Sequence, residues 1–525
     1  MKIKTYIIPI WVGVLLASGV LLGRWLAKTY PSDEAVILSE TSRSNHLNKA
    51  KLSKLIDYIE YEYVDDVNTD SITDLTVNSI LAKLDPHSTY ISKENMQDIA
   101  ESMNGRFVGV GIHFYMYKDT LAVIRSVEGS DAAAKGIRLG DRILNANNDT
   151  IFGKRLTSDA IRNILKGDIG SSVQLTVYRK ETDSVFTVDV ERRNIPIKSV
   201  DAYYMVNDTT AYLRINRFAE TTHSEFTEAI KALKKEKFTT ILLDLRNNTG
   251  GFLTKGIEIA DEFLPEGERI VFTKNNKGEI KNSYATEGGL LENETVFVLV
   301  NEQSASASEI VAGALQDNDR GTIIGRRTFG KGLIQSEMPL PDGSVVRLTT
   351  ARYYTPTGRS IQKPYSEYQK DKLHERIKNN NPVSADSINV KDSLKFTTPK
   401  GKIVYGGGGI IPDIFVPMNV QPDDFMTSEV LKSGLVNFFL FEYLDTHPHL
   451  QKPDLKSFVE DFEISKEMAD SFSKFLENRR IFINPDLYFD DINKSLKVSL
   501  AEIWFDDNVA ARIRNEDDPF FLIEQ

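Results

Sequence analysis

The sequence predicts a multidomain α/β protein with a helical N-terminal region, a β-rich domain, an α/β core with a mainly parallel sheet, and a helical C-terminal domain. Three observations predict this fold class. The chain has 525 residues, which is too long for a single core. Short strands separated by turn signals fill residues 106–193. From residue 196 onward, strands alternate with helices, which is typical of a parallel sheet with crossover helices.

The composition is that of a globular protein, with 41% apolar and 26% charged residues. A net charge of -11 and the lack of a basic stripe argue against general nucleic-acid binding. The chain has no cysteine, which excludes a disulfide framework, a thiol nucleophile and thiolate metal ligands.

The first 30 residues predict a membrane anchor or a signal segment. Lys2 and Lys4 precede an apolar run from Tyr6 to Gly23. A helix needs about 20 apolar residues to cross a bilayer, whereas the core of a cleaved signal has about 7–15. The length favours an uncleaved anchor, although Ala17-Ser-Gly19 offers a weak cleavage site. The rest of the chain is then expected in the cell envelope, anchored in the inner membrane and facing the periplasm, or secreted to the periplasm if the segment is removed.

Residues 31–100 predict a small helical region. Apolar residues recur at helical spacing over Leu47–Val64, and a second helix fits Ser71–Leu84. Proline disfavours helical backbone in the residue before it, so this helix is expected to end at Asp85-Pro86.

Residues 101–193 predict a β-rich domain. Strands are predicted at Val108–Phe114, Leu121–Val127, Arg142–Ala146 and Val173–Arg179, and helices at Ala132–Lys135 and Ser158–Leu165. With Gly109, Val110, Gly111 and Ile112, this pattern resembles a PDZ domain, a module that binds peptide C-termini; the four residues resemble the loop whose backbone N–H groups hold a terminal carboxylate. A Gly-x-Gly motif alone is also compatible with a simple strand bend.

Residues 194–420 predict the α/β core, with a charged insertion near 364–398, and residues 421–525 predict an appended helical domain without a chemical motif. The core strands are expected at Thr210–Arg214, Thr240–Leu245, Thr295–Val300 and Thr322–Gly325. The helices between them are expected at Ser224–Glu236, Thr254–Phe263 and Ser306–Gln316.

Two of these strands open into segments suited to catalysis. One leads into the glycine turn Gly250-Gly251, whose backbone N–H groups can approach a ligand closely. The next leads into a small-residue run before a helix, with three candidate serines at 304, 306 and 308. A serine at a helix start is usually only an N-cap, and spacing alone does not choose among the three.

Lys331 lies between two glycines, in a predicted strand that also carries Gln335. Positions 331 and 335 face the same way on a strand, so the amide is expected to orient the amine. A lysine acts as a base only where burial or positive charge lowers its pKa. The alternative is an ordinary surface lysine.

As a set, these motifs resemble the carboxy-terminal processing proteases of the tail-specific protease family, which are PDZ-containing serine peptidases. The resemblance covers about residues 45–417, in order. It rests on Leu84-Asp-Pro-His-Ser-Thr-Tyr90, the PDZ segment, Asp244-Leu-Arg-Asn-Asn-Thr-Gly-Gly251, Ser304-Ala-Ser-Ala-Ser-Glu309, Thr328-Phe-Gly-Lys-Gly332, Arg352-Tyr-Tyr-Thr-Pro-Thr-Gly-Arg359 and Tyr405-Gly-Gly-Gly-Gly-Ile410. One departure is Thr249, where many members have proline.

The resemblance implies roles for residues of this chain. Ser306 is the implied nucleophile, Lys331 the general base and Gln335 its support. The N–H of Ala307, with that of Gly250 or Gly251, forms the implied oxyanion hole. Asp317 matches an acidic position with a structural or supporting role.

The implied activity is cleavage of proteins recognised at their free C-termini, through an acyl-enzyme and without a metal or organic cofactor. A Ser–His–Asp hydrolase using His87 or His113 is one rival. A membrane-tethered PDZ scaffold with an inactive protease-like domain is another. Whether an adaptor or a second copy of the chain takes part is left open.

Overall fold

The computed structural model describes residues 50–368, 390–418 and 427–521, except 428, 432, 485 and 486. The chain divides into two compact units, residues 1–84 and 85–525, and each is described separately. In the first unit, a helix over 50–62 precedes α3 (Thr69–Leu81), which is capped by the Asn68 side chain accepting from the Ser71 N–H. The predicted anchor or signal segment lies outside the described residues. Within the part of the chain described, no helix has the length and hydropathy to cross a bilayer.

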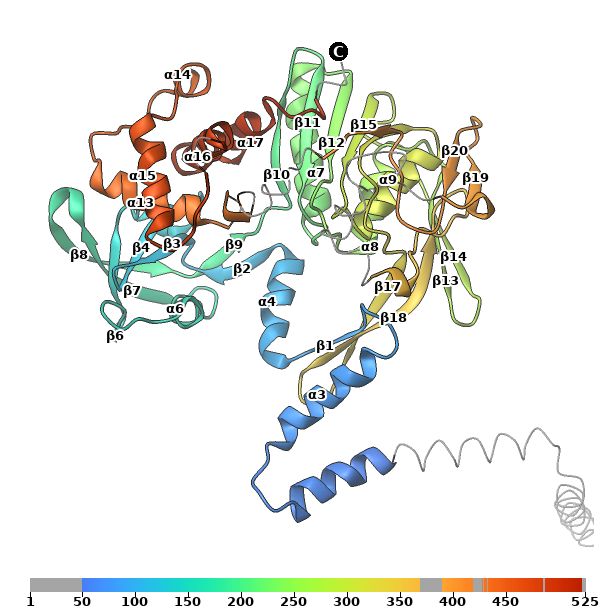
Figure 1. Ribbon diagram of the computed structural model, residues 1–525, viewed down its shortest axis with the longest axis horizontal. Helices are drawn as coiled ribbons and strands as arrows, with labels where there is room; N and C mark the ends of the chain where they lie inside the picture. The colour runs from blue at the N-terminus through green and yellow to red at the C-terminus, as the bar shows by residue number, and fades with distance from the viewer. Residues whose placement is uncertain are drawn as a thin grey trace, which may run out of the picture. The chain divides into compact units, whose positions relative to one another are not determined.

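The PDZ domain forms a sheet with the strand order β3-β4-β5-β7-β8, and β6 pairs with β5 (Figure 1). Its strands are β3 (Ile112–Tyr117), β4 (Thr120–Ser126), β5 (Arg142–Ala146), β6 (Asp149–Thr150), β7 (Ser172–Arg179) and β8 (Ser184–Glu191). Two helices, α5 (Asp131–Ala134) and α6 (Ser158–Leu165), pack on its core. At its boundary, β2 (Arg106–Gly109) pairs with β9 (Arg193–Pro196).

The α/β core is built on a six-stranded sheet with the order β10-β11-β12-β15-β16-β21. All neighbours are parallel except β10 and β11, so the prediction of a mainly parallel sheet is confirmed. The strands are β10 (Val200–Met205), β11 (Thr210–Ile215), β12 (Thr240–Asp244), β15 (Thr295–Val300), β16 (Gly321–Gly325) and β21 (Ile414–Phe415).

Three helices cover one face of this sheet. From β11 to β16 the strands follow in chain order in one direction, and right-handed crossovers therefore place every connecting helix on the same side. These helices are α7 (Thr222–Leu233), α8 (Leu253–Asp261) and α9 (Ala307–Asp317), and they share one apolar core with the alternate residues of the strands.

The end of the chain covers the opposite face of the sheet. Leu242, Leu299 and Ile324 point into a second apolar cluster together with Ala511 and Phe520. The helix α17 (Asp507–Asn515) lies beside β10 (Figure 1), where the Asn508 side chain accepts from the Tyr203 N–H at 2.7 Å. A parallel sheet needs cover on both faces. The C-terminal region thus completes the core, whereas the sequence predicted only an appended domain.

A second, antiparallel sheet of the core was not predicted. It contains β1 (Thr89–Ile91), β13 (Arg269–Asn275), β14 (Ile280–Tyr284), β17 (Leu333–Pro339) and β18 (Val345–Tyr354). Part of the predicted N-terminal helical region differs accordingly. Residues 89–91 pair with β18 of the core, and α4 (Lys93–Asn104) follows them. The predicted insertion at 364–398 falls largely on residues outside those described; β19 (Lys395–Thr397) lies at its end and pairs with β20 (Ile403–Tyr405), which follows it.

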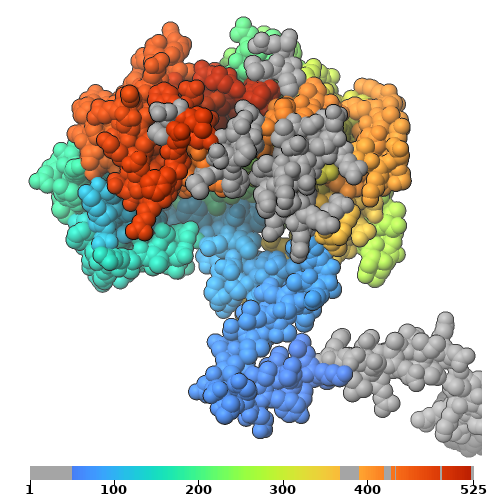
Figure 2. Space-filling view, viewed as in Figure 1, coloured from blue at the N-terminus to red at the C-terminus, as the bar shows by residue number. Residues whose placement is uncertain are grey.

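The C-terminal helices also hold the PDZ domain. Besides α17 they are α13 (Leu435–Thr446), α14 (Leu455–Glu460), α15 (Lys466–Glu477) and α16 (Phe489–Trp504). Tyr115 of β3 stacks on Phe438 with ring centres 4.2 Å apart, and Arg142 of β5 pairs with Asp445 at 2.7 Å. In Figure 2 the orange and red C-terminal surface directly adjoins the cyan and teal surface of the PDZ domain.

Candidate active site

A cavity of about 610 Å³ opens at the carboxyl ends of the central strands. Such ends meet at one edge of a parallel sheet, so the loops that follow β12 and β15 share a wall. The cavity is lined by residues that include Ser306, Lys331, Gln335, Gly250, Gly251, Arg347 and Tyr353. The predicted nucleophile, base, supporting amide and glycine turn therefore lie around one cavity.

Ser306 differs from the two serines beside it. It is partly exposed and lines the cavity, and its backbone has φ 57° and ψ -112°. An ordinary N-cap is extended, and this unusual conformation costs about 1–3 kcal/mol in a non-glycine residue. Ser304 and Ser308 are fully buried, and their hydroxyls donate to the carbonyls of Leu245 and Asn248 at 2.8 and 2.9 Å.

One fully buried carboxylate, that of Glu309, holds the backbones of Ser306 and Lys331. One of its oxygens accepts from both N–H groups, each at 2.9 Å. The other accepts from the Gly330 N–H at 2.7 Å and the Thr328 hydroxyl at 2.5 Å. Because these amides turn toward a carboxylate instead of a neighbouring strand, β17 begins only at residue 333. The prediction that Lys331 lies in a strand is therefore wrong.

The side chain of Lys331 is nevertheless oriented by Gln335. Its Nζ donates to Oε1 of Gln335 at 2.8 Å, and Nε2 of Gln335 donates to the carbonyl of His87 at 2.6 Å. The His87 backbone is fixed in turn by Asp85, whose carboxylate accepts from the N–H groups of His87 and Ser88. Sequence reasoning missed this support, although the Leu84–Tyr90 motif pointed to the segment.

The electrostatic surroundings favour a neutral lysine. Burial lowers the pKa of Lys331, and the nearby positive charge of Arg347 lowers it further, against weaker opposition from Glu309 and Asp85. Burial, the largest cause, lowers the pKa of His87 to about 4, so its imidazole is neutral at neutral pH.

Tyr353 is a second support that sequence reasoning missed. Its buried hydroxyl lies 2.7 Å from the carbonyl of Lys331 and 3.0 Å from that of Ser306. A phenol has one proton, so it donates to these two carbonyls in turn or shares the proton between them. Tyr353 lies within the motif Arg352–Arg359, which was the sequence feature that could have pointed to it.

The glycine turn packs tightly against Ser306. A Cβ on Gly250 would lie 2.7 Å from the Cβ of Ser306, so only glycine fits there. The N–H of Gly250 donates to the Asn248 side chain at 2.8 Å. Among the hydrogen bonds of the described residues, none uses the N–H of Gly251 or Ala307. Of the three predicted oxyanion donors, Gly251 and Ala307 therefore have N–H groups without a hydrogen-bond partner among the described residues, whereas that of Gly250 is engaged.

Asp317 lies away from the cavity, at the end of α9. It forms a fully buried ion pair with Arg359 at 2.7 Å and accepts from the hydroxyl and the N–H of Thr357. It ties the helix that begins after Ser306 to the loop that follows β18, which is a structural contact.

The residues predicted to bind a peptide C-terminus lie from the end of β2 to the start of β3. Gly111 has φ 78°, and among the hydrogen bonds of the described chain none uses the N–H of Val110 or Gly111. In the described sheet, β3 pairs with β4 alone, so its other edge has no strand partner. Ile112, at the start of β3, and residues of α6 pack on the PDZ core.

The structure does not bring a histidine into the role of a triad base. His113 lies in β3 of the PDZ domain. His87 is absent from the cavity lining and contributes its carbonyl, as described above. Among the described residues, no cluster of three or more side chains is suited to hold a metal ion.

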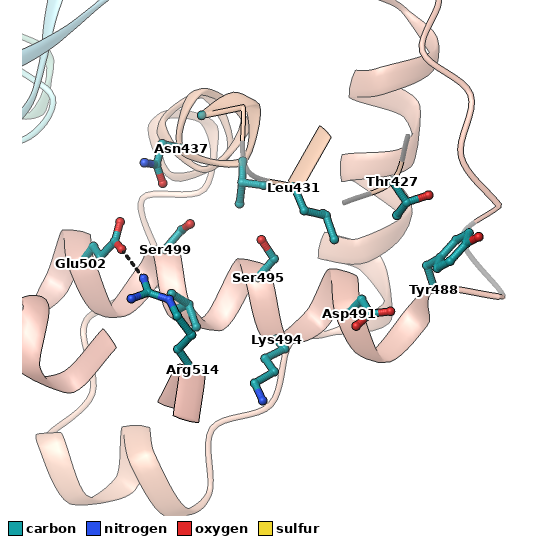
Figure 3. Close-up of a pocket in the computed structure, with 13 residues that line it drawn as sticks. Thr427, Leu431, Asn437, Tyr488, Asp491, Lys494, Ser495, Ser499, Glu502 and Arg514 are labelled. Atoms are coloured by element: carbon teal, nitrogen blue, oxygen red, sulfur yellow. Dashed lines mark hydrogen bonds and ion pairs between the residues drawn. The ribbon is translucent and has the colours of Figure 1, made fainter. Parts of the chain in front are cut away.

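A second cavity, of about 580 Å³, lies within the C-terminal helices (Figure 3). Its wall includes Ser495, Ser499 and the ion pair of Glu502 with Arg514, whose atoms are 3.0 Å apart. Burial raises the pKa of Glu502, against the opposing charge of Arg514. Neither Ser306 nor Lys331 contributes to this cavity.

Comparisons with known proteins agree with this architecture. Residues 209–369 match Peptidase family S41, residues 108–190 match a PDZ domain, and residues 426–504 match a family of unknown function. The chain is 36% identical to a carboxy-terminal-processing protease of Bartonella bacilliformis, over 62% of this chain and 75% of that protein. It is 40% identical to a carboxyl-terminal-processing protease of Picosynechococcus, over 55% and 70%. A solved structure of a photosystem II D1 C-terminal processing protease is 25% identical, with a TM-score of 0.37, and covers 70% of this chain and 86% of that one.

Proposed function

The chain belongs to peptidase family S41, and we propose that it is an endopeptidase in which Ser306 is the nucleophile and Lys331 the general base. It is a serine peptidase of the carboxy-terminal processing type and carries a PDZ domain. The observation that carries the proposal is the common support of these two residues. They line one cavity, and their backbones are bound by the same Glu309 carboxylate and the same Tyr353 hydroxyl.

The proposed reaction proceeds through an acyl-enzyme. The neutral amine of Lys331 takes the proton of the Ser306 hydroxyl while Oγ attacks the peptide carbonyl. The N–H groups of Gly251 and Ala307 stabilise the negative oxygen of the tetrahedral intermediate. The lysine ammonium then gives its proton to the departing amine. A water molecule attacks the ester, its proton passing to Lys331, and Ser306 is released with its proton restored.

We propose that the PDZ domain selects the substrate by its free C-terminus. The open edge of β3 offers main-chain hydrogen bonds to an extended peptide, and the N–H groups of Val110 and Gly111 suit a terminal carboxylate. Unstructured tails meet this requirement because they add as a strand without unfolding first. The proposed location is the cell envelope, from the apolar run near the N-terminus.

The experiment compares purified full-length variants on an unstructured polypeptide that ends in small apolar residues. Ser306→Ala removes the nucleophile, and Lys331→Arg keeps the positive charge but replaces a titratable amine by a guanidinium that stays protonated. We expect both variants to lose cleavage. Ser336→Ala, in the neighbouring strand, and Lys277→Arg, at an exposed turn, serve as matched controls and should cleave normally. Normal turnover by Lys331→Arg would reject the dyad.

Two outcomes separate the remaining alternatives. If the wild type and Ser306→Ala leave the substrate equally intact, a scaffold that only binds peptides is favoured. Blocking the substrate's terminal carboxylate as an amide should slow cleavage, because the carboxylate is the group proposed to bind at the PDZ loop. Equal cleavage of the acid and the amide would contradict that capture step.

A further inference from the structure

The last described residues of the chain contact the strand end that carries the glycine turn. Arg246 lies two residues after the end of β12, and its guanidinium lies 2.5 Å from the Asp518 carboxylate. The ring of Phe520 packs on the same guanidinium, 4.4 Å from ring centre to carbon. Phe520 is 5% exposed, so this contact is an interior one.

Arg246 is held from both sides. On its inner side it binds the buried carboxylate of Asp244, which also accepts from the Tyr212 hydroxyl at 2.8 Å. Burial raises the pKa of Asp244, but the charge and hydrogen bonds of Arg246, together with the charge of Arg214, outweigh it and keep the pKa below its usual range. On its outer side Arg246 has the C-terminal segment. Removing the Asp518 carboxylate therefore leaves the guanidinium ion-paired on its inner side only, with the Phe520 ring as its remaining outer contact.

The residues that follow Arg246 connect it to the glycine turn through hydrogen bonds. Asn247, next in the chain, has φ 60° and exchanges two hydrogen bonds with Asn301, at 2.9 and 2.8 Å. The Asn248 side chain accepts from the Gly250 N–H, and its carbonyl accepts from the Ala305 N–H. A shift at residue 246 thus moves a connected set of backbone groups that ends at the proposed oxyanion donors.

The same ring touches the strand that leads to the lysine. A Cβ on Gly325, the last residue of β16, would lie 2.8 Å from the Phe520 ring. The guanidinium carbon of Arg326 lies 5.9 Å from the ring centre, five residues before Lys331. Phe520 therefore packs against the ends of two strands whose loops both reach the cavity.

We propose that Asp518 and Phe520 are positioning residues for the oxyanion turn, which makes the C-terminal domain part of the active-site support. They act through Arg246 and do not touch substrate. The inference rests on the proposed function for its kinetic consequences, but the ordering of the turn is a property of the fold. Nothing in the match of 426–504 to a family of unknown function assigns this role, and residue 518 lies beyond that match.

The test uses the full chain with Asp518→Asn and, as a matched control, Asp517→Asn. Both remove one charge from adjacent positions, but Asp517 is exposed and its ion pair is with Lys494, at 3.7 Å. A second pair, Phe520→Leu and Phe520→Tyr, removes or keeps an aromatic ring over Arg246. The melting temperature of each variant is measured first, and kinetics are run well below it.

Three readouts follow. Hydrogen exchange of the amides at 246–252 reports order in the turn without requiring activity. Steady-state kinetics separate kcat from KM. A substrate-like peptide boronic acid reports the tetrahedral state, since the serine oxygen adds to its trigonal boron and the serine proton passes to the general base.

For Asp518→Asn and Phe520→Leu we expect faster exchange at 246–252. We also expect kcat and boronate affinity to fall by about 10-fold with little change in KM, because a misplaced oxyanion donor weakens the transition state more than substrate binding. Asp517→Asn and Phe520→Tyr should resemble the wild type. If exchange at 246–252 in Asp518→Asn matches that in Asp517→Asn, the inference is overturned. If the wild type neither cleaves peptide nor binds the boronate, the proposed function fails, and the exchange measurement alone then decides the inference.

Discussion

Replacing Glu309 by glutamine tests whether this carboxylate aligns the backbones of Ser306 and Lys331, because it leaves both of those side chains unchanged. The substitution keeps the size of a side chain that touches no substrate in the proposed mechanism. In the native protein, one carboxylate oxygen accepts from the N–H groups of Ser306 and Lys331, and the other from the Gly330 N–H and the Thr328 hydroxyl. A glutamine offers an acceptor on one side only, so its NH₂ group must face donors on the other.

The expected loss of stability follows from the number of donors that lose their acceptor. At least two donors lose their acceptor at a fully buried site, and each costs about 1–3 kcal/mol, so the free energy of unfolding should fall by about 2–6 kcal/mol. Where the protein stays folded, kcat should fall by about 100-fold, because a shift of about 1 Å between reacting groups has that effect.

Denaturant unfolding and steady-state kinetics of the full-length variant measure the two effects. Glu225→Gln is the matched control, since that carboxylate also lies in the first turn of a helix and accepts from two backbone N–H groups, those of Ser199 and Val200. It should lose stability and keep kcat. A Glu309→Gln variant with native kcat would refute the view that this carboxylate aligns the two residues.

Two further predictions concern the lysine and its backbone. The positive charge of Arg347 lowers the pKa of Lys331, so Arg347→Gln should raise that pKa and move the acid limb of the kcat/KM profile to higher pH, with less activity near neutrality. Arg347 forms an ion pair with Glu337 at 2.7 Å, and Glu337→Gln breaks this pair but keeps the arginine charge. An identical displacement of the acid limb in Glu337→Gln would argue against the electrostatic explanation. Tyr353→Phe removes the hydroxyl that bridges Ser306 and Lys331 and should lower stability by about 1–3 kcal/mol and kcat more than KM. Tyr354→Phe is the control, since Tyr354 is the next residue in the chain and its ring stacks on Phe272. Equal kinetic effects of the two substitutions would count against the hydroxyl bridge.

The sequence predicted the parallel sheet because strand and helix periodicity alternate clearly from residue 210 to 325. It missed the antiparallel sheet, since residues 89–91 pair with 345–347, and no local pattern reports a pairing over that distance. The sequence also predicted that the C-terminal region is an appended helical domain, and not that it covers the parallel sheet. The periodicity of α17 shows that one face is apolar, but not that the face lies on the sheet.

For the active site, spacing alone left three serines. Burial separates them, because two have hydroxyls bonded to interior carbonyls and only Ser306 lines the cavity. The contact of Gln335 with Lys331 was predicted from strand alternation, yet Lys331 precedes the strand and the pairing of β17 is irregular after Ile334. The contact forms because the carbonyl of His87 accepts from the amide of Gln335 and fixes its orientation. His87 lies 248 residues away in the chain, so no local pattern around Gln335 could predict this support.

The conformation of Ser306 argues that this support is functional. A serine with φ 57° and ψ -112° is strained by about 1–3 kcal/mol, and such strain persists only where the surroundings enforce it. Here Glu309 binds its N–H, Tyr353 lies at its carbonyl, and the Cα of Gly250 packs so closely that no side chain fits between them. The contact of Glu309 with the Ser306 N–H is that of a capping box, but a helix cap needs neither of the other two contacts, since extended backbone serves that purpose without strain. The three contacts together hold the hydroxyl at the cavity that also receives the amine of Lys331. The strain is therefore best explained as the cost of presenting a nucleophile, and relaxed backbone at residue 306 in a crystal structure of the full chain would remove that argument.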